Sequence, residues 1–168
     1  MNKEFLGTEI QGRIQRKDLI SRLNSTSMDT KAYKVFQKMM ETDYCSQWLG
    51  IEPLLIEEGK CHLKMKVRKE MLNGFGTLHG GIAFSLADSA LAFAINSFGR
   101  ISPLINGNMN YAKAAVENDV LTAKATVISL GNRKADIDVN VYCNQESEPY
   151  YFFRGTVYRT SKEHLIES

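Results

Sequence analysis

The spacing of hydrophobic and polar positions changes along the chain and predicts its elements. Residues 29–42 place apolar side chains three and four apart, which predicts a helix with Asp29 as its N-cap and an end near Thr42. From Trp48 onward apolar and polar residues alternate, as in a sheet with one buried face. Residues 82–95 interrupt this alternation, because nearly every position is apolar, and a helix there would be buried almost all round.

The alternating segments predict six strands. They are residues 48–57, 60–67, 102–111, 120–129, 135–144 and 150–160. Turn-forming residues occupy 58–59, 131–133 and 144–148, so successive strands are joined as hairpins, and Gly99 is a plausible C-terminal cap of the buried helix. One buried helix among hairpins excludes repeated parallel βαβ units. The prediction is an α+β architecture in which an antiparallel sheet wraps around a long central helix.

The first 28 residues differ from the rest. They mix charged and polar residues with scattered apolar ones, and Ile10, Ile14, Leu19 and Leu23 form only an imperfect amphipathic pattern. We therefore divide the chain into a peripheral N-terminal extension, residues 1–28, and one folded domain, residues 29–168, which is a common domain size.

Composition narrows the class of protein. The 168 residues carry 21 Lys and Arg against 19 Asp and Glu, a net charge of +2, which gives no support for nucleic-acid binding. The three cysteines are an odd number without metal-ligand spacing, so we expect reduced thiols, no metal site and no cofactor. The N-terminus lacks the apolar run of a signal peptide, and residues 82–95 are too short to span a bilayer. We expect a cytoplasmic protein with no membrane partner.

Three polar residues interrupt the buried helix. Ser85, Asp88 and Ser89 are three and four residues apart, so they share one stripe of the helix. A carboxylate is rarely buried among apolar residues without a partner, because its desolvation is costly. Asp88 is therefore the first candidate for a functional residue. His62 and His164 have no evident partners, and we expect both to face solvent.

The start of the same helix is rich in glycine. Glycines at 74, 76, 80 and 81 surround His79. Glycine allows close approach of the backbone to a ligand, and the first N–H groups of a helix have no partner within it. This segment could bind an oxyanion.

These residues together form a specific motif. Asn73 is followed six residues later by His79-Gly80-Gly81, and Asp88 lies nine residues after the histidine in Leu86-Ala87-Asp88-Ser89. The motif closely resembles that of the hotdog-fold acyl-CoA thioesterases of the phenylacetate-degradation (PaaI-like) type. The resemblance extends from about Trp48 to about Lys162, and it implies a hotdog fold and hydrolysis of an acyl-CoA to free acid and CoA.

The resemblance also implies roles for the motif. Asp88 would be the general base toward water, or the nucleophile that forms an anhydride; the residues alone leave both open. The N–H of Gly80 would receive the thioester carbonyl oxygen. Asn73 would help to hold the catalytic water, and His79 would orient the loop or contact the thioester.

Further residues are assigned to the substrate. Gly81 adjoins the predicted carbonyl site, and Ser89 would hydrogen-bond Asp88 or the substrate. Arg133 and Lys134, with Lys113 and Arg154 as further candidates, would contact the phosphates of coenzyme A. The resemblance implies aromatic acyl groups such as phenylacetyl and hydroxyphenylacetyl, or medium-chain ones. It also implies a homodimer, assembling into a homotetramer, whose active site is shared between subunits.

Two other functions fit part of the sequence. Hotdog hydratases and dehydratases of acyl thioesters pair a histidine with a separate acidic residue, but no second carboxylate beyond Asp88 is evident here. The second is a non-catalytic acyl-CoA sensor, since some hotdog domains carry an N-terminal DNA-binding domain and the extension here is basic. About forty residues with one clear helix, however, make a poor helix-turn-helix module. Release of free thiol separates hydrolysis from both alternatives.

Overall fold

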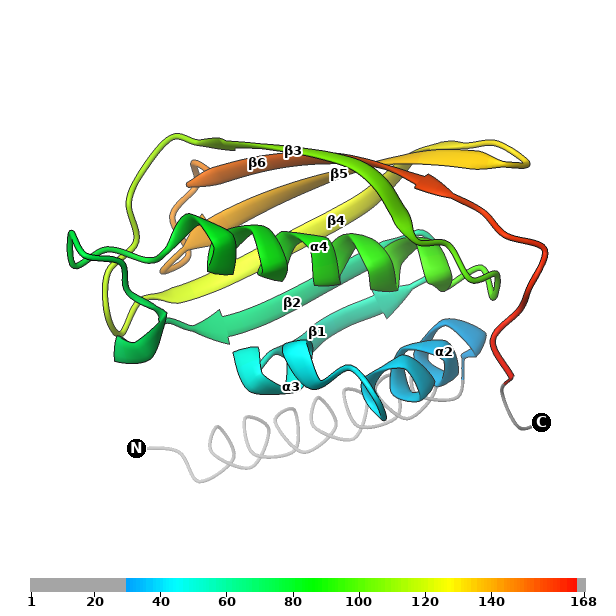
Figure 1. Ribbon diagram of the computed structural model, residues 1–168, viewed down its shortest axis with the longest axis horizontal. Helices are drawn as coiled ribbons and strands as arrows, with labels where there is room; N and C mark the ends of the chain where they lie inside the picture. The colour runs from blue at the N-terminus through cyan, green and yellow to red at the C-terminus, as the bar shows by residue number, and fades with distance from the viewer. Residues whose placement is uncertain (1–29, 166–168) are drawn as a thin grey trace, which may run out of the picture.

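A long helix packed against one face of a six-stranded sheet dominates the computed structural model, which describes residues 30–165 (Figure 1). The helices are α2 (Lys31–Met40), α3 (Tyr44–Leu49) and α4 (Gly80–Asn96), with a short 3-10 turn η1 (Lys69–Met71) before α4. The strands are β1 (Glu52–Glu57), β2 (Lys60–Lys66), β3 (Leu104–Tyr111), β4 (Val120–Leu130), β5 (Lys134–Cys143) and β6 (Tyr151–Tyr158). The predicted extension, the helix considered within it and the proposed cap Asp29 lie outside the described residues.

The sheet is antiparallel throughout. Its strand order is β1-β2-β4-β5-β6-β3, and every neighbouring pair runs antiparallel. The connection from β2 to β3 contains α4, and it joins strands that are not neighbours, because β3 pairs with β6 at the edge opposite β1. The α+β architecture predicted from the hairpin pattern is confirmed.

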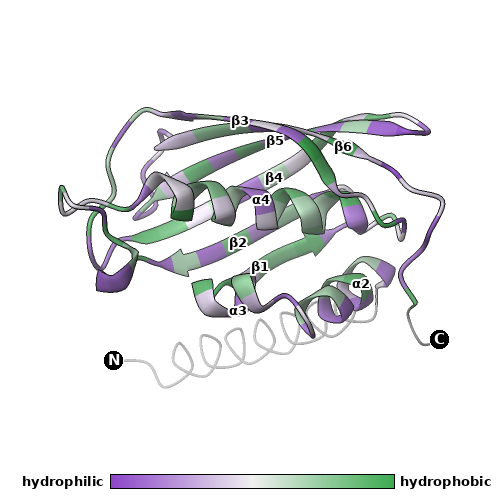
Figure 2. Ribbon diagram, viewed as in Figure 1, coloured by the Kyte–Doolittle hydropathy of each residue, from purple (hydrophilic) through white to green (hydrophobic). Residues whose placement is uncertain are grey.

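The core lies between α4 and the sheet. Strands β2, β4, β5 and β6 alternate buried and more exposed side chains along their length, and Figure 2 shows the matching alternation of hydropathy. α2 packs against the C-terminal half of α4, where the rings of Phe36 and Phe93 meet edge to face with centroids 4.8 Å apart. Among residues 30–165, no helix is both long enough and apolar enough to cross a membrane.

α4 is buried except along one stripe. Leu86, Ala87, Ala90 and Leu91 are fully buried, whereas Gly81, Ser85, Asp88 and Ala92 are at least partly exposed. The exposed positions repeat every three or four residues, so they share one side of the helix. This side is small and polar, and it carries the carboxylate.

The segment before β1 was predicted wrongly. Trp48 lies in a helix, α3, and the first strand begins at Glu52. Asp43 caps the start of α3 by accepting a hydrogen bond from the N–H of Ser46, and Gly50 ends the helix with φ of 70°, a conformation that favours glycine. Six residues are too few to show helical periodicity, so only these two caps marked the helix.

Two smaller expectations also change. The N-cap of α2 is Thr30, whose side chain accepts from the N–H of Tyr33. His164, expected to face solvent, is partly buried and lies with Nε2 2.7 Å from Oδ1 of Asn96 at the end of α4. Burial lowers the pKa of His164. This contact fastens the C-terminal segment to the helix.

Candidate active site

Asn73 organises the loop that leads into α4. Its Oδ1 accepts from the backbone N–H of Phe75 at 2.9 Å, and its Nδ2 donates to Oγ1 of Thr77 at 3.0 Å. The backbone of Asn73 also donates to the carbonyl of Thr77. The side chain predicted to hold a catalytic water is thus engaged in shaping this turn, and Thr77 is its partner.

His79 is the N-cap of α4. Its Nδ1 accepts from the N–H of Gly81 at 2.9 Å, and its own N–H donates to the carbonyl of Met71. Because Nδ1 accepts a hydrogen bond, this nitrogen carries no proton in the capped arrangement. The ring of His79 therefore caps the start of the helix.

The first N–H of α4 is the available one. Within residues 30–165 the N–H of Gly80 makes no hydrogen bond, whereas that of Gly81 is bound to His79. The hydroxyl of Tyr111 donates to the carbonyl of Gly80 at 3.0 Å. An unpaired N–H at a helix N-terminus, reinforced by the helix dipole, can bind a developing negative charge. Gly80, rather than Gly81, therefore suits a carbonyl oxygen.

A cavity of about 250 Å³ opens beside this N-terminus. Its walls include the rings of Tyr111 and Tyr151, whose centroids are 5.6 Å apart, and the side chain of Lys113. The complete lining is Asn73, Thr77, Leu78, Gly80, Tyr111, Lys113, Ala114 and Tyr151. Nothing in the sequence marked Tyr111 or Thr77 as part of this site. Tyr111 ends β3, 31 residues after Gly80, and no local pattern relates the two.

Asp88 is half-buried on the exposed stripe of α4. Its carboxylate makes no hydrogen bond or ion pair with residues 30–165. Burial raises the pKa of this carboxyl above its usual range, and the nearby negative charge of Asp43 raises it further. A carboxylate with a raised pKa is a stronger base, so Asp88 is suited to take a proton from water.

The neighbouring serines serve other contacts. Oγ of Ser89 lies 2.8 Å from Oγ of Ser46 on α3, and Ser85 donates to the carbonyl of Gly81 at 2.9 Å. Neither hydroxyl bonds to Asp88. Of the two contacts considered for Ser89, the one with Asp88 is absent among residues 30–165, and the one with substrate stays a prediction.

Gly80 and Asp88 are far apart within one chain. They are separated by eight residues of α4, and a helix rises about 1.5 Å per residue, so they lie roughly 12 Å apart along the axis. One carbonyl group cannot contact both. The two groups predicted to share a substrate can do so only if another copy of the helix is present.

The basic residues predicted to bind phosphates are dispersed. Arg133 and Lys134 are exposed in the hairpin between β4 and β5, which lies at the opposite end of the molecule from the start of α4 (Figure 1). Lys113 lines the cavity and pairs with Glu146 at 3.0 Å. Arg154 binds both oxygens of Asp138 across the sheet. Of these four, only Lys113 lies beside Gly80.

The described residues show no gathering of three or more His, Cys, Asp or Glu side chains that could hold a metal ion. Among residues 30–165, the groups of this region that could act on a substrate include the backbone N–H of Gly80 and the carboxylate of Asp88.

The chain is similar in sequence to known thioesterases. Residues 75–150 match the model of the thioesterase superfamily. The acyl-coenzyme A thioesterase PaaI of Escherichia coli is 35% identical over 132 residues, which cover 79% of this chain and 94% of that protein. Human acyl-coenzyme A thioesterase 13 is 29% identical over 119 residues, which cover 69% of this chain and 85% of that protein.

Solved structures extend the likeness to the fold. The structure of E. coli PaaI, a protein of the phenylacetic acid degradation operon, superposes with a TM-score of 0.76 at 33% identity and covers 79% of this chain and 96% of its own. A hypothetical thioesterase of Streptococcus pneumoniae, solved with coenzyme A, gives 0.65 at 27% identity over 68% and 88%. Sequence and fold therefore agree that this chain belongs to the thioesterase superfamily, among the hotdog-fold acyl-CoA thioesterases of the PaaI-like type.

Proposed function

We propose that this protein hydrolyses aromatic or medium-chain acyl-CoA thioesters, with water activated by Asp88 and the carbonyl oxygen held by Gly80. The observation that carries the proposal is Asp88 itself, a half-buried carboxylate with a raised pKa and no partner among the described residues. The names of the E. coli and human relatives support the reaction, and the coenzyme A in the S. pneumoniae structure supports the substrate class. The operon named for E. coli PaaI supports an aromatic acyl group.

The reaction can be written with these groups. Asp88 takes a proton from water as the water oxygen attacks the thioester carbonyl carbon. The carbonyl oxygen becomes negative and is stabilised by the Gly80 N–H at the positive end of α4. The C–S bond then breaks, the electron pair leaves with the CoA sulfur, and a proton returns to the thiolate. A thiolate is a good leaving group, so the site needs no strong acid.

The active site is proposed to form between two subunits. Antiparallel pairing of two α4 helices with the two-fold axis near Phe84 would bring Gly80 of one protomer beside Asp88 of the other. The exposed stripe of α4 is small enough to allow such an approach, and β3, at one edge of the sheet, has eight residues without a charge. Such an edge is suited to pairing with a second β3. The dimer is proposed to assemble further into a homotetramer, as the family resemblance implies.

A panel of thioesters tests the reaction. We expect the wild-type protein to release free thiol from phenylacetyl-, hydroxyphenylacetyl- or medium-chain acyl-CoA, measured with a thiol-reactive chromophore. Benzoyl- and short straight-chain forms define the limits of the acyl pocket. Binding of acyl-CoA without thiol release would instead indicate a sensor, and a substrate altered with its thioester intact would indicate a hydratase or dehydratase.

Mixing two inactive variants tests the shared site. Gly80→Pro removes one group and Asp88→Asn the other, so a mixed dimer has one site with both groups intact and one with neither. Random pairing of equal amounts in co-expression should restore about a quarter of wild-type thiol release. Each variant expressed alone is the control. A mixed pool as inactive as its parents would place both groups in the same chain and contradict the proposal.

A further inference from the structure

The helix α3 brings a second carboxylate to the neighbourhood of Asp88. Asp43 precedes α3, and its Oδ1 accepts from the N–H of Ser46 at 2.9 Å while its Oδ2 accepts from the Ser46 hydroxyl at 2.7 Å. Two donors on two different oxygens fix the orientation of a carboxylate. Asp43 is thus held in one place although it is only half-buried.

A chain of hydroxyl groups links this carboxylate to α4. Ser46 is fully buried, and its hydroxyl proton is directed to Asp43, so the 2.8 Å contact with Ser89 requires Ser89 to donate. The chain therefore runs from Ser89 to Ser46 to Asp43. Ser89 is the residue next to Asp88, which means that the same hydrogen bonds fasten α3 to α4 beside the proposed base.

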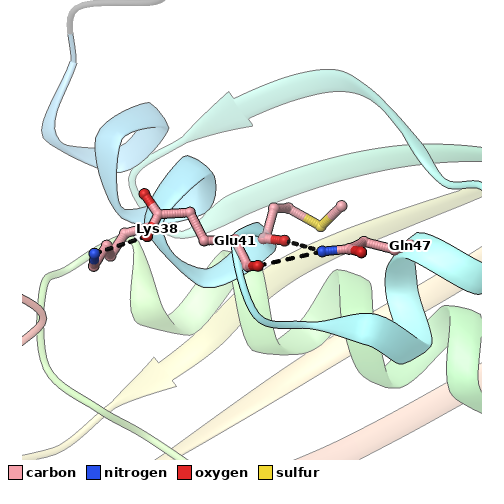
Figure 3. Close-up of polar contacts among 4 residues, drawn as sticks. Lys38, Glu41 and Gln47 are labelled. Carbon is pink, nitrogen blue, oxygen red and sulfur yellow. Dashed lines mark hydrogen bonds and ion pairs between the residues drawn. The ribbon is translucent and has the colours of Figure 1, made fainter.

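The turn that carries Asp43 is fixed from its other side. Figure 3 shows Gln47 of α3 reaching back to the end of α2, where its Nε2 donates to the carbonyl of Met40 at 2.7 Å and approaches that of Glu41 at 3.4 Å. Glu41 also pairs with Lys38 at 2.7 Å. With α2 packed on α4, the whole α2–α3 corner has a defined position relative to Asp88.

Among residues 30–165, Asp43 is the charged group that acts on the pKa of Asp88. The buried side chains of α2 are Ala32, Val35 and Phe36, of which Phe36 packs on Phe93 of α4, and the strands bury mainly apolar side chains in the core. The phenols of Tyr111 and Tyr151 lie at the N-terminal end of α4, beside Gly80. Burial is the larger cause of the raised pKa of Asp88, and the charge of Asp43 is the second.

We propose that Asp43, held by Ser46, is a positioning residue of the reaction whose charge acts through Asp88 and moves the acidic limit of turnover to higher pH. The inference rests on the proposed function of Asp88 as the base. A base works in its ionised form, so thiol release falls as the pH drops through the pKa of Asp88. A neighbouring negative charge moves this acidic limb to higher pH and makes the ionised carboxylate more basic.

The test is the pH profile of Asp43→Asn. Asparagine is as good an N-cap as aspartate, so α3 should persist. Removal of the charge should move the acidic limb of kcat to lower pH by about 0.5–1 unit. On the plateau, turnover should fall about two- to three-fold, because Asp88 has become a weaker base. A profile that coincides with that of the wild type would leave Asp43 as a helix cap only and overturn the inference.

Glu41→Gln is the matched control. It removes an exposed carboxylate two residues away and should leave the profile unchanged. The wild-type enzyme gives a second measurement without a substitution. Added salt partly screens the charge of Asp43, so the acidic limb of the wild-type pH profile should move to lower pH as ionic strength rises. If Asp88→Asn is inactive while Asp43→Asn behaves as wild type, only the role of Asp43 fails; if Asp88→Asn is active, the proposed function fails.

Discussion

Asp88→Asn is expected to lower thiol release by a factor of about a hundred or more, the usual contribution of a general base. The side chain keeps its size, and the carboxylate makes no hydrogen bond or ion pair within residues 30–165 that the change would break. Because burial raises the pKa of Asp88, removal of this carboxyl also removes a cost of burying charge, so the folded state should be retained. Initial rates on the best acyl-CoA, with a thermal melt of each protein, measure both effects.

Asp136→Asn is the control for this substitution. Asp136 is a half-buried aspartate of β5 that accepts from the hydroxyl of Thr156, and asparagine can accept the same hydrogen bond. This variant should turn over substrate like the wild type. Equal activity of Asp88→Asn and the wild type would mean that the chemistry has been placed on the wrong residue.

Gly80→Pro should lower kcat by about 10²–10³-fold, the cost of removing one donor from an oxyanion hole. Proline lacks the N–H but is favoured at the first position of a helix. The preceding residue, His79, has φ of −62° and ψ of 131°, the extended conformation that proline tolerates before it. The substitution therefore removes the donor and leaves the helix in place.

Gly80→Ala distinguishes the loss of the N–H donor from the steric effect of an added side chain. A Cβ at this position would lie 3.4 Å from the ring of Tyr111, an ordinary contact, and the N–H would remain. The alanine variant should keep most of the wild-type kcat. Equal losses in both variants would indicate a steric effect at Tyr111, and no loss in the proline variant would remove Gly80 from the oxyanion site.

The sequence predicted the parts of the fold that have local patterns. The strict alternation around Cys61 and Val139 marked strands that are buried on one face, and the apolar run after Gly81 marked α4. Asp88 stood out for the same reason, since a carboxylate in an apolar helix is conspicuous. Each of these signals comes from residues that are adjacent or one turn apart.

Contacts between distant segments could not be read in this way. Ser46 and Ser89 are 43 residues apart, and Tyr111 and Gly80 are 31 apart, so their hydrogen bonds depend on how α3 and β3 pack against α4. Ser89 and Gly81 were both predicted to contact substrate. In the structure the hydroxyl of Ser89 contacts Ser46, and the N–H of Gly81 donates to His79. The same limit applies to any group supplied by a second subunit.

The two edge strands of the sheet differ in their tendency to pair with strands of other chains. β1 carries Glu52, Pro53 and Glu57, and charges and proline at an edge discourage the addition of a foreign strand. β3 has no such residue. An uncovered β3 is a template for intermolecular β-structure, so newly synthesised chains with this edge open would be prone to aggregate. Subunit association would thus protect the chain's solubility, and a substitution that weakened it would reduce the yield of soluble protein before any effect on catalysis could be measured.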